Sequence, residues 1–181
     1  MTKRPGVYPL YIIFILSGFA GLGYEMVWTR MLAVGLGHEI VSMLAVVAAY
    51  FFGLSLGAGL FDTRISRSRF PGRWYALAEL IIAIWCVVLM LVIPFMNHFS
   101  ADLIGTDPSP AYHWLIAFLI PFILLSPATL AMGMTLTAME RLVSRLNGSN
   151  RSISLLYALN TAGAMFGIMV TTYLLTPSLG H

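Results

Sequence analysis

Apolar runs of 20 or more residues recur along nearly the whole sequence and are separated by short polar connections. A helix of about 20 residues crosses the roughly 30 Å hydrocarbon core of a bilayer. Only 9% of the 181 residues are charged, whereas about a quarter are charged in a typical soluble domain. The sequence therefore predicts an all-α polytopic membrane helix bundle that forms a single transmembrane domain over residues 1–181.

The apolar runs predict five transmembrane helices. The first run continues well beyond the apolar core of a signal peptide, which is about 7–15 residues long, so we interpret it as a membrane span. Pro121 and Pro127 lie inside the fourth run and are expected to kink it, and Pro177 is expected to end the fifth. The predicted helices cover residues 8–35, 39–61, 74–97, 112–142 and 152–175.

The basic residues predict how the chain is oriented. Nine of the ten Lys and Arg residues lie before the first helix, around the connection between the second and third, or around that between the fourth and fifth. Arg30 alone lies towards the other side. Cytoplasmic loops of membrane proteins carry an excess of Lys and Arg. We therefore expect a cytoplasmic N-terminus, an external C-terminus and a location in the inner (cytoplasmic) membrane of a bacterium.

Small residues at helical spacing indicate where the helices pack. Gly53 and Gly57 form one GxxxG pattern, and Gly163 and Gly167 form another. Helix association in lipid depends on such small residues, because they let two backbones approach closely. With Gly18 and Gly21 in the first helix, the pattern predicts close contact among the first, second and fifth helices.

Glu25 and Arg30 are charges inside an otherwise apolar helix. Glu25 shares a face with Gly18 and Gly21 and is interpreted either as a structural carboxylate or as a substrate- or proton-binding group. Arg30 lies on another face, where it would reach outer headgroups or another chain. The candidate residues for helix packing or partner docking are Gly18, Gly21, Glu25, Trp28, Arg30, Gly53, Gly57, Gly163 and Gly167.

Glu79 and Asn160 lie at similar predicted depths in the third and fifth helices. One interpretation pairs Glu79 with Arg64 or Arg73 and bonds Asn160 to a neighbouring backbone. The other interpretation joins Glu79 and Asn160 in an intramembrane polar cluster that accepts a cation, since ionisable residues within membrane spans commonly mark functional sites.

The sequence contains none of the usual catalytic or cofactor-binding signatures. It lacks a Walker loop and a GxSxG motif, and its glycines fall within predicted helices rather than in a strand–loop–helix unit. The four histidines have no regular metal-ligand spacing, and the arginine-rich connection is explained by orientation. We therefore predict no catalytic site, no metal, no cofactor and no nucleic-acid partner.

Five segments carry a family resemblance. They are SGFAGLGYEMVWTRML, AAYFFGLSLGAGLFDTR, YALAELIIAIW, SPATLAMGMTLTAMERL and LLYALNTAGAMFGIM. In this order they resemble the membrane module of membrane-bound spermidine synthase-like proteins. The chain also resembles half of a major-facilitator transporter, with Asp62 and Arg64 at matching positions of the loop between its second and third spans. The resemblance implies helices that precede a soluble Rossmann-like transferase domain. That domain does not occur in this sequence, so no catalytic residue is carried over.

These observations leave three functions open. The preferred one is a non-catalytic subunit that packs into, or stabilises, a larger membrane assembly. A second is a half-transporter-like module that dimerises around Glu25, Glu79 and Asn160 and moves a small cation or a polyamine. A third is a membrane anchor for a separate spermidine synthase-like aminopropyltransferase. The expected partners are other membrane subunits and lipids, with a homo-oligomer as a further option.

Overall fold

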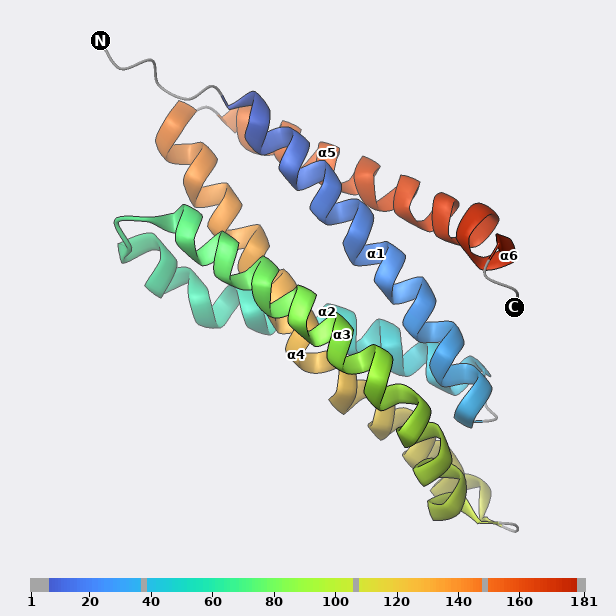
Figure 1. Cartoon of the computed structure of the whole chain (residues 1–181). Helices are drawn as coiled ribbons and strands as arrows, with labels where there is room; N and C mark the ends of the chain where they lie inside the picture. Colours follow the sequence, from blue (N-terminus) through green and yellow to red (C-terminus); the bar gives the residue numbers. More distant parts are fainter. Residues whose placement is uncertain (1–6, 37–38, 106–107, 148–149, 179–181) are drawn as a thin grey trace.

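The computed structural model describes residues 7–36, 39–105, 108–147 and 150–178, and in these ranges it is helical with no β-strand. Five helices are long and apolar enough to cross a membrane, which confirms the predicted all-α polytopic architecture. They are α1 (Tyr8–Leu36), α2 (Glu39–Arg67), α3 (Pro71–Ile104), α4 (Pro110–Asn147) and α5 (Asn150–Val170), as Figure 1 shows. A π-helical turn, η1 (Thr171–Leu175), and a short turn, α6 (Thr176–Ser178), continue α5.

The helices form two unequal groups. α4 packs along both α2 and α3, whereas α5 packs mainly on α1 and makes only a minor contact with α4. α1 joins the groups, because it also contacts α2 and α3. In Figure 1, α1 accordingly crosses the molecule between α5 and the other three helices. The expected contact between the second and fifth helices is not formed in the described residues.

The polar ends of the helices are longer than the apolar runs predict. The loop expected over residues 62–73 is mostly helical, since α2 continues to Arg67 and α3 begins at Pro71. The Arg145 guanidinium of α4 donates hydrogen bonds to the carbonyls of Ser66 (3.0 Å) and Arg69 (3.3 Å). The first bond satisfies a carbonyl at the end of α2 that lacks a helical partner, and the second holds the connection to α3. The apolar run therefore marks the span of the membrane rather than the end of the helix.

Prolines interrupt helical hydrogen bonding inside α4, and side chains bind carbonyls beside them. The Ser126 hydroxyl donates to the Phe122 carbonyl at 2.6 Å. The Trp85 indole of α3 donates to the Leu124 carbonyl at 2.8 Å. Pro127 removes the amide that would donate to the Ile123 carbonyl, and these two bonds go to the carbonyls on either side of it.

The end of the fifth span differs from the prediction at Pro177. The Thr176 amide bonds to the Thr171 carbonyl, and the Thr176 hydroxyl donates to the same carbonyl at 2.8 Å. This wider turn precedes α6, in which Pro177 lies. The backbone stays helical at Thr176, and α6 continues to Ser178 although Pro177 has no N–H to donate. Pro177 therefore does not end the helical structure.

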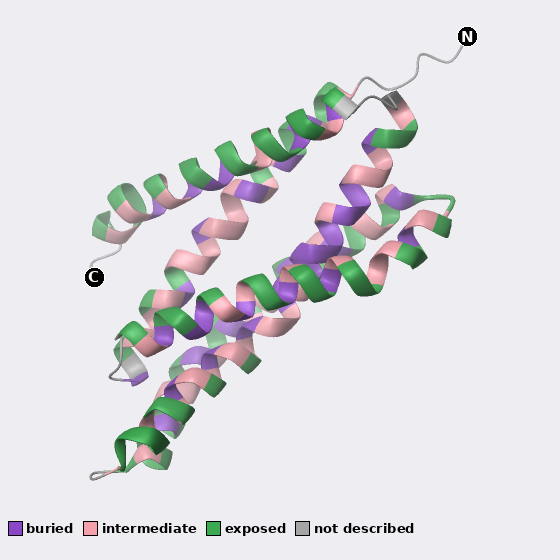
Figure 2. Cartoon of the chain, turned by 180° about the vertical axis from the view of Figure 1, so that it is seen from behind, coloured by how far each residue is buried: buried purple, intermediate pink, exposed green. Residues whose placement is uncertain are grey.

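The core is a set of apolar contacts centred on α4, while the outward faces are also apolar. Trp28, Leu32, Leu89 and Leu125 are buried in the largest cluster. Figure 2 shows exposed positions along the outer side of every long helix, and many of them are large apolar residues such as Leu16, at 60% exposure. Such a surface suits lipid, in which the helices satisfy their own backbone groups.

Candidate functional site

Glycines of α5 make its contact with α1. A Cβ atom placed on Gly163 or Gly167 would collide with the backbone carbonyl of Ile15 or Phe19, respectively. A Cβ placed on Gly18 of α1 would meet the side-chain oxygen of Asn160 at 2.7 Å. The two backbones therefore pack directly on each other, and these glycines lie inside the molecule.

The glycines of α2 pack on a different helix from the one expected. Gly53 lies against Thr129, and Gly57 lies against the carbonyl of Leu130, both in α4. Gly133 of α4 lies in turn against the Leu54 carbonyl of α2. The prediction that the α2 glycines join the first and fifth helices is therefore wrong. A GxxxG pattern predicts that another helix packs closely at that position, but it does not identify which helix.

These contacts show which of the residues predicted for helix packing or partner docking are used for packing within the chain. Gly18, Gly53, Gly57, Gly163 and Gly167 are covered by neighbouring helices within this chain. Trp28 is also unsuited to docking, because it is only 4% exposed. It stacks on the Tyr24 ring with 5.8 Å between ring centroids. This aromatic pair packs inside the bundle instead of presenting a surface.

A small-residue stripe lies exposed on α2, and our sequence reasoning missed it. Ser55, Gly59 and Thr63 are exposed at four-residue spacing on α2. A Cβ placed on Gly59 would meet no other atom within 4 Å. The small–xxx–small spacing was visible in the sequence. Only the GxxxG pattern of Gly53 and Gly57 was considered, and these glycines belong to the opposite, buried face of the same helix.

The two charges of α1 are separated as the helical spacing predicts. Glu25 is partly buried, so neighbouring helices cover part of its side chain. Its carboxylate forms no ion pair among the described residues. Arg30 is exposed and lies near the end of the span Tyr8–Val34. Its guanidinium can therefore reach the headgroup region, whereas Glu25 stays within the bundle.

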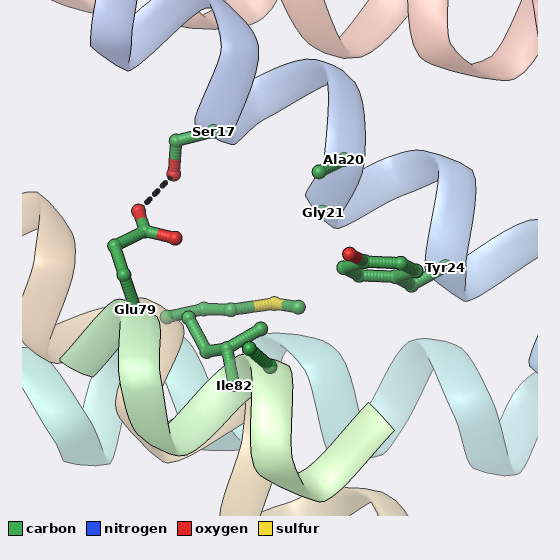
Figure 3. A pocket seen from close by; sticks show the side chains of 8 residues that line it. Ser17, Ala20, Gly21, Tyr24, Glu79 and Ile82 are labelled. Atoms are coloured by element: carbon green, nitrogen blue, oxygen red, sulfur yellow. Dashed lines mark hydrogen bonds between the residues drawn. The ribbon is translucent and has the colours of Figure 1, made fainter. Parts of the chain in front are cut away.

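Glu79 is bound to α1 rather than to an arginine. The Ser17 hydroxyl donates a 2.6 Å hydrogen bond to Glu79 Oε1 (Figure 3). The expected pairing with Arg64 or Arg73 is not formed, since the ion pair of the described residues joins Asp62 and Arg141. Arg73 instead lies over the Phe70 ring, 4.5 Å from its centroid. Glu79 therefore lacks a basic partner in the described part of the chain.

Glu79 and Asn160 line two different cavities on either side of α1. A cavity of about 60 Å³ lies between α1, α3 and α4 and includes Glu79 and Tyr24. A second, of about 200 Å³, lies between α1, α2, α4 and α5 and includes Asn160. Both cavities are lined by Ser17, Gly21 and Met132. Glu79 and Asn160 thus flank the same segment of α1 without forming the direct pair that a compact polar cluster requires.

An acidic and a basic side chain form an ion pair between α2 and α4 at the polar end of the bundle. Arg141 Nη2 of α4 lies 2.7 Å from Asp62 Oδ1 of α2, and both side chains are about half exposed. Asp62, one of the two positions on which the predicted transporter resemblance rests, thus contacts α4. No three His, Cys, Asp or Glu side chains are grouped for a metal within the described ranges.

Five long apolar helices with internal glycine contacts define a polytopic integral membrane protein. Comparisons with protein families, with curated proteins and with solved structures find no match for this chain. The likeness of its five helical segments to the spermidine synthase-like membrane module therefore stays a prediction.

Proposed function

We propose that this chain is a non-catalytic subunit of a larger membrane assembly, and that a transmembrane helix of another subunit docks on α2. The observation that carries this proposal is the exposed stripe of Ser55, Gly59 and Thr63. In lipid, small residues favour helix contact because they allow close backbone approach. The stripe therefore has the composition of a helix interface and no helix of this chain on it.

Gly59 supports the proposal because it makes no close packing contact with another helix in the described part of the chain. Glycine within a helix costs about 1 kcal/mol relative to alanine. Gly53 and Gly57 offset that cost through their contacts with α4, whereas nothing lies within 4 Å of a Cβ placed on Gly59. A second helix on this face gives Gly59 the same packing role that its neighbours have.

The surroundings of the stripe place the docking surface within one leaflet of the membrane. α2 ends in Arg64 and Arg67, and the connection that follows carries Arg69 and Arg73. By the positive-inside rule we expect this end on the cytoplasmic side, and we propose that the membrane is the inner membrane of a bacterium. The docking helix would therefore meet α2 in the cytoplasmic half of the bilayer.

Affinity purification from native membranes tests this proposal. The tagged chain, extracted in lipid nanodiscs, is expected to retain another membrane protein that mass spectrometry identifies. Gly59→Leu should reduce the recovery of that protein at least tenfold, because a leucine side chain would fill the contact. Ala76→Leu, which adds similar bulk at an exposed position of α3, should leave recovery unchanged.

Other outcomes would reject the proposal. Equal recovery with Gly59→Leu and Ala76→Leu would remove the stripe as the docking surface. Recovery of a second, differently tagged copy alone would make the chain a homo-oligomer instead. Recovery of a soluble aminopropyltransferase, unaffected by Gly59→Leu, would favour the anchor function.

A further inference from the structure

We propose that Glu79 is the anionic group of a binding site for a small apolar molecule that carries one protonated amine. The amine would lie in the cavity between α1, α3 and α4. The apolar body would extend past Gly21 into the larger cavity beside α5. This inference goes beyond the docking function and does not depend on the stripe on α2.

The first step of the argument is the unbalanced charge of Glu79. One carboxylate oxygen accepts the Ser17 hydrogen bond, and Figure 3 shows the second directed into the space in front of Tyr24. No basic side chain in the described ranges forms an ion pair with Glu79. A carboxylate within a membrane span is costly without a partner. A cation bound beside the carboxylate would supply that partner.

The lining of the cavity selects an organic cation over a metal ion. Calcium and magnesium are bound by six or so oxygen atoms. Here the polar groups are the carboxylate, the Ser17 hydroxyl and the Tyr24 hydroxyl, which points towards Glu79 in Figure 3. The remaining lining is apolar: Ala20, Gly21, Ile82, Ala83 and Met132. A protonated amine needs only a few acceptors.

The two cavities set the size of the ligand. The smaller one, about 60 Å³, exceeds the roughly 30 Å³ that one water molecule occupies in the liquid, and so accommodates an ammonium group. The larger, about 200 Å³, exceeds the roughly 150 Å³ of a cavity known to hold benzene. The arrangement therefore suits an amine with an apolar body of about six carbon atoms.

Gly21 and Met132 lie at the boundary of the two cavities, where the apolar body of the ligand would pass. Gly21 lines both of them, and a Cβ placed on it would meet only Met132, at 3.9 Å from its sulfur atom. That distance is an ordinary van der Waals contact. An alanine at this position would therefore add a methyl group at the shared boundary without displacing a helix, unlike an alanine at Gly18, which would collide with Asn160.

Methyl NMR of the purified chain with ¹³C-labelled methionine tests the site. Met132 lines both cavities, whereas Met90 of α3 is 69% exposed and reports amine that merely enters the detergent. Hexylammonium is expected to shift the Met132 methyl signal saturably and to move the Met90 signal only linearly. Hexanol, of the same length but uncharged, and sodium chloride should produce no saturable shift. The Met132 signal is assigned with Met132→Leu.

Three variants decide the outcome. Glu79→Gln keeps an acceptor for Ser17 but removes the charge, and it should weaken hexylammonium binding at least tenfold. Gly21→Ala should weaken it about tenfold, since steric overlap of one methyl group opposes the ligand. Asp102→Asn removes an exposed acidic group outside both cavities and should leave the affinity unchanged.

The proposal is overturned if Glu79→Gln and Gly21→Ala both bind hexylammonium as the wild type does. It is also overturned if the Met132 and Met90 methyl signals shift together without saturation. That result would indicate that hexylammonium only partitions into the detergent. Gly59→Leu should bind the amine normally, and Glu79→Gln should retain the co-purified subunit. Failure of one proposal is thereby distinguished from failure of the other.

Discussion

Ser17 of α1 and Glu79 of α3 are joined by a 2.6 Å hydrogen bond across 62 positions of the sequence. The bond links α1, on which α5 packs, to the group formed by α2, α3 and α4. Tyr75, one turn before Glu79, interacts with both partners. This polar contact therefore helps to fix α1 against α3.

Replacing Ser17 by alanine should destabilise the bundle by about 1.5–3 kcal/mol, the range for hydrogen bonds to charged groups. The loss arises because one Glu79 oxygen loses its donor inside the protein. The free energy of unfolding in mixed micelles is the measurement. Ser55→Ala, at an exposed position of α2, is the matched control and should change stability by less than about 0.5 kcal/mol. Equal effects of the two substitutions would contradict the structural role of the bond.

The glycine contact between α1 and α5 makes a second prediction. Gly167→Ala should destabilise the chain by about 1–3 kcal/mol, because the added methyl group collides with the Phe19 carbonyl. Gly59→Ala should be neutral or stabilise the purified chain by up to about 1 kcal/mol, since alanine is the better helix former and nothing lies near that position. Thermal unfolding of both variants in the same detergent checks this difference. A loss of stability in Gly59→Ala would show that this face is covered.

The sequence predicts the five membrane spans but not which helices pack against one another. Apolar length alone predicts five helices, because a span needs about 20 apolar residues. The end of α2 was missed because Asp62 and Arg64 read as a loop, whereas bonds from Arg141 and Arg145 of α4 support a helix there. Those partners lie about 80 positions away, and helical periodicity carries no information about such contacts.

The same limit applies to the candidate sites. The periodicity of α1 correctly separates Glu25 from Arg30, since both belong to one helix and their angle follows from 3.6 residues per turn. It does not reveal that Glu79 binds Ser17, because that contact depends on how α3 packs on α1. The choice between an arginine and a serine as the partner of Glu79 needed the tertiary structure.

The ion pair between Asp62 and Arg141 should contribute little to stability. Both side chains are about half exposed, and exposed pairs contribute about 0.2–1 kcal/mol. A double-mutant cycle with Asp62→Ala and Arg141→Ala should give a coupling free energy in this range that decreases as salt rises from 0.05 to about 0.5 M. A coupling above about 2 kcal/mol, or one insensitive to salt, would indicate that the pair is buried in the membrane protein.

The Trp85 indole anchors α3 to the proline-containing part of α4. Its Nε1 donates to the Leu124 carbonyl at 2.8 Å, three residues before Pro127, where helical bonding is disturbed. Trp85→Phe keeps an aromatic ring but removes the donor, and should destabilise the chain by about 0.5–1.5 kcal/mol. Trp85→Leu should cost more, since it also removes buried surface. Because the carbonyl belongs to an interrupted turn, hydrogen–deuterium exchange in α4 should increase around Leu124 in Trp85→Phe. Exchange that rises equally along all of α4 would place the bond's effect on the whole helix and contradict its local role at the proline.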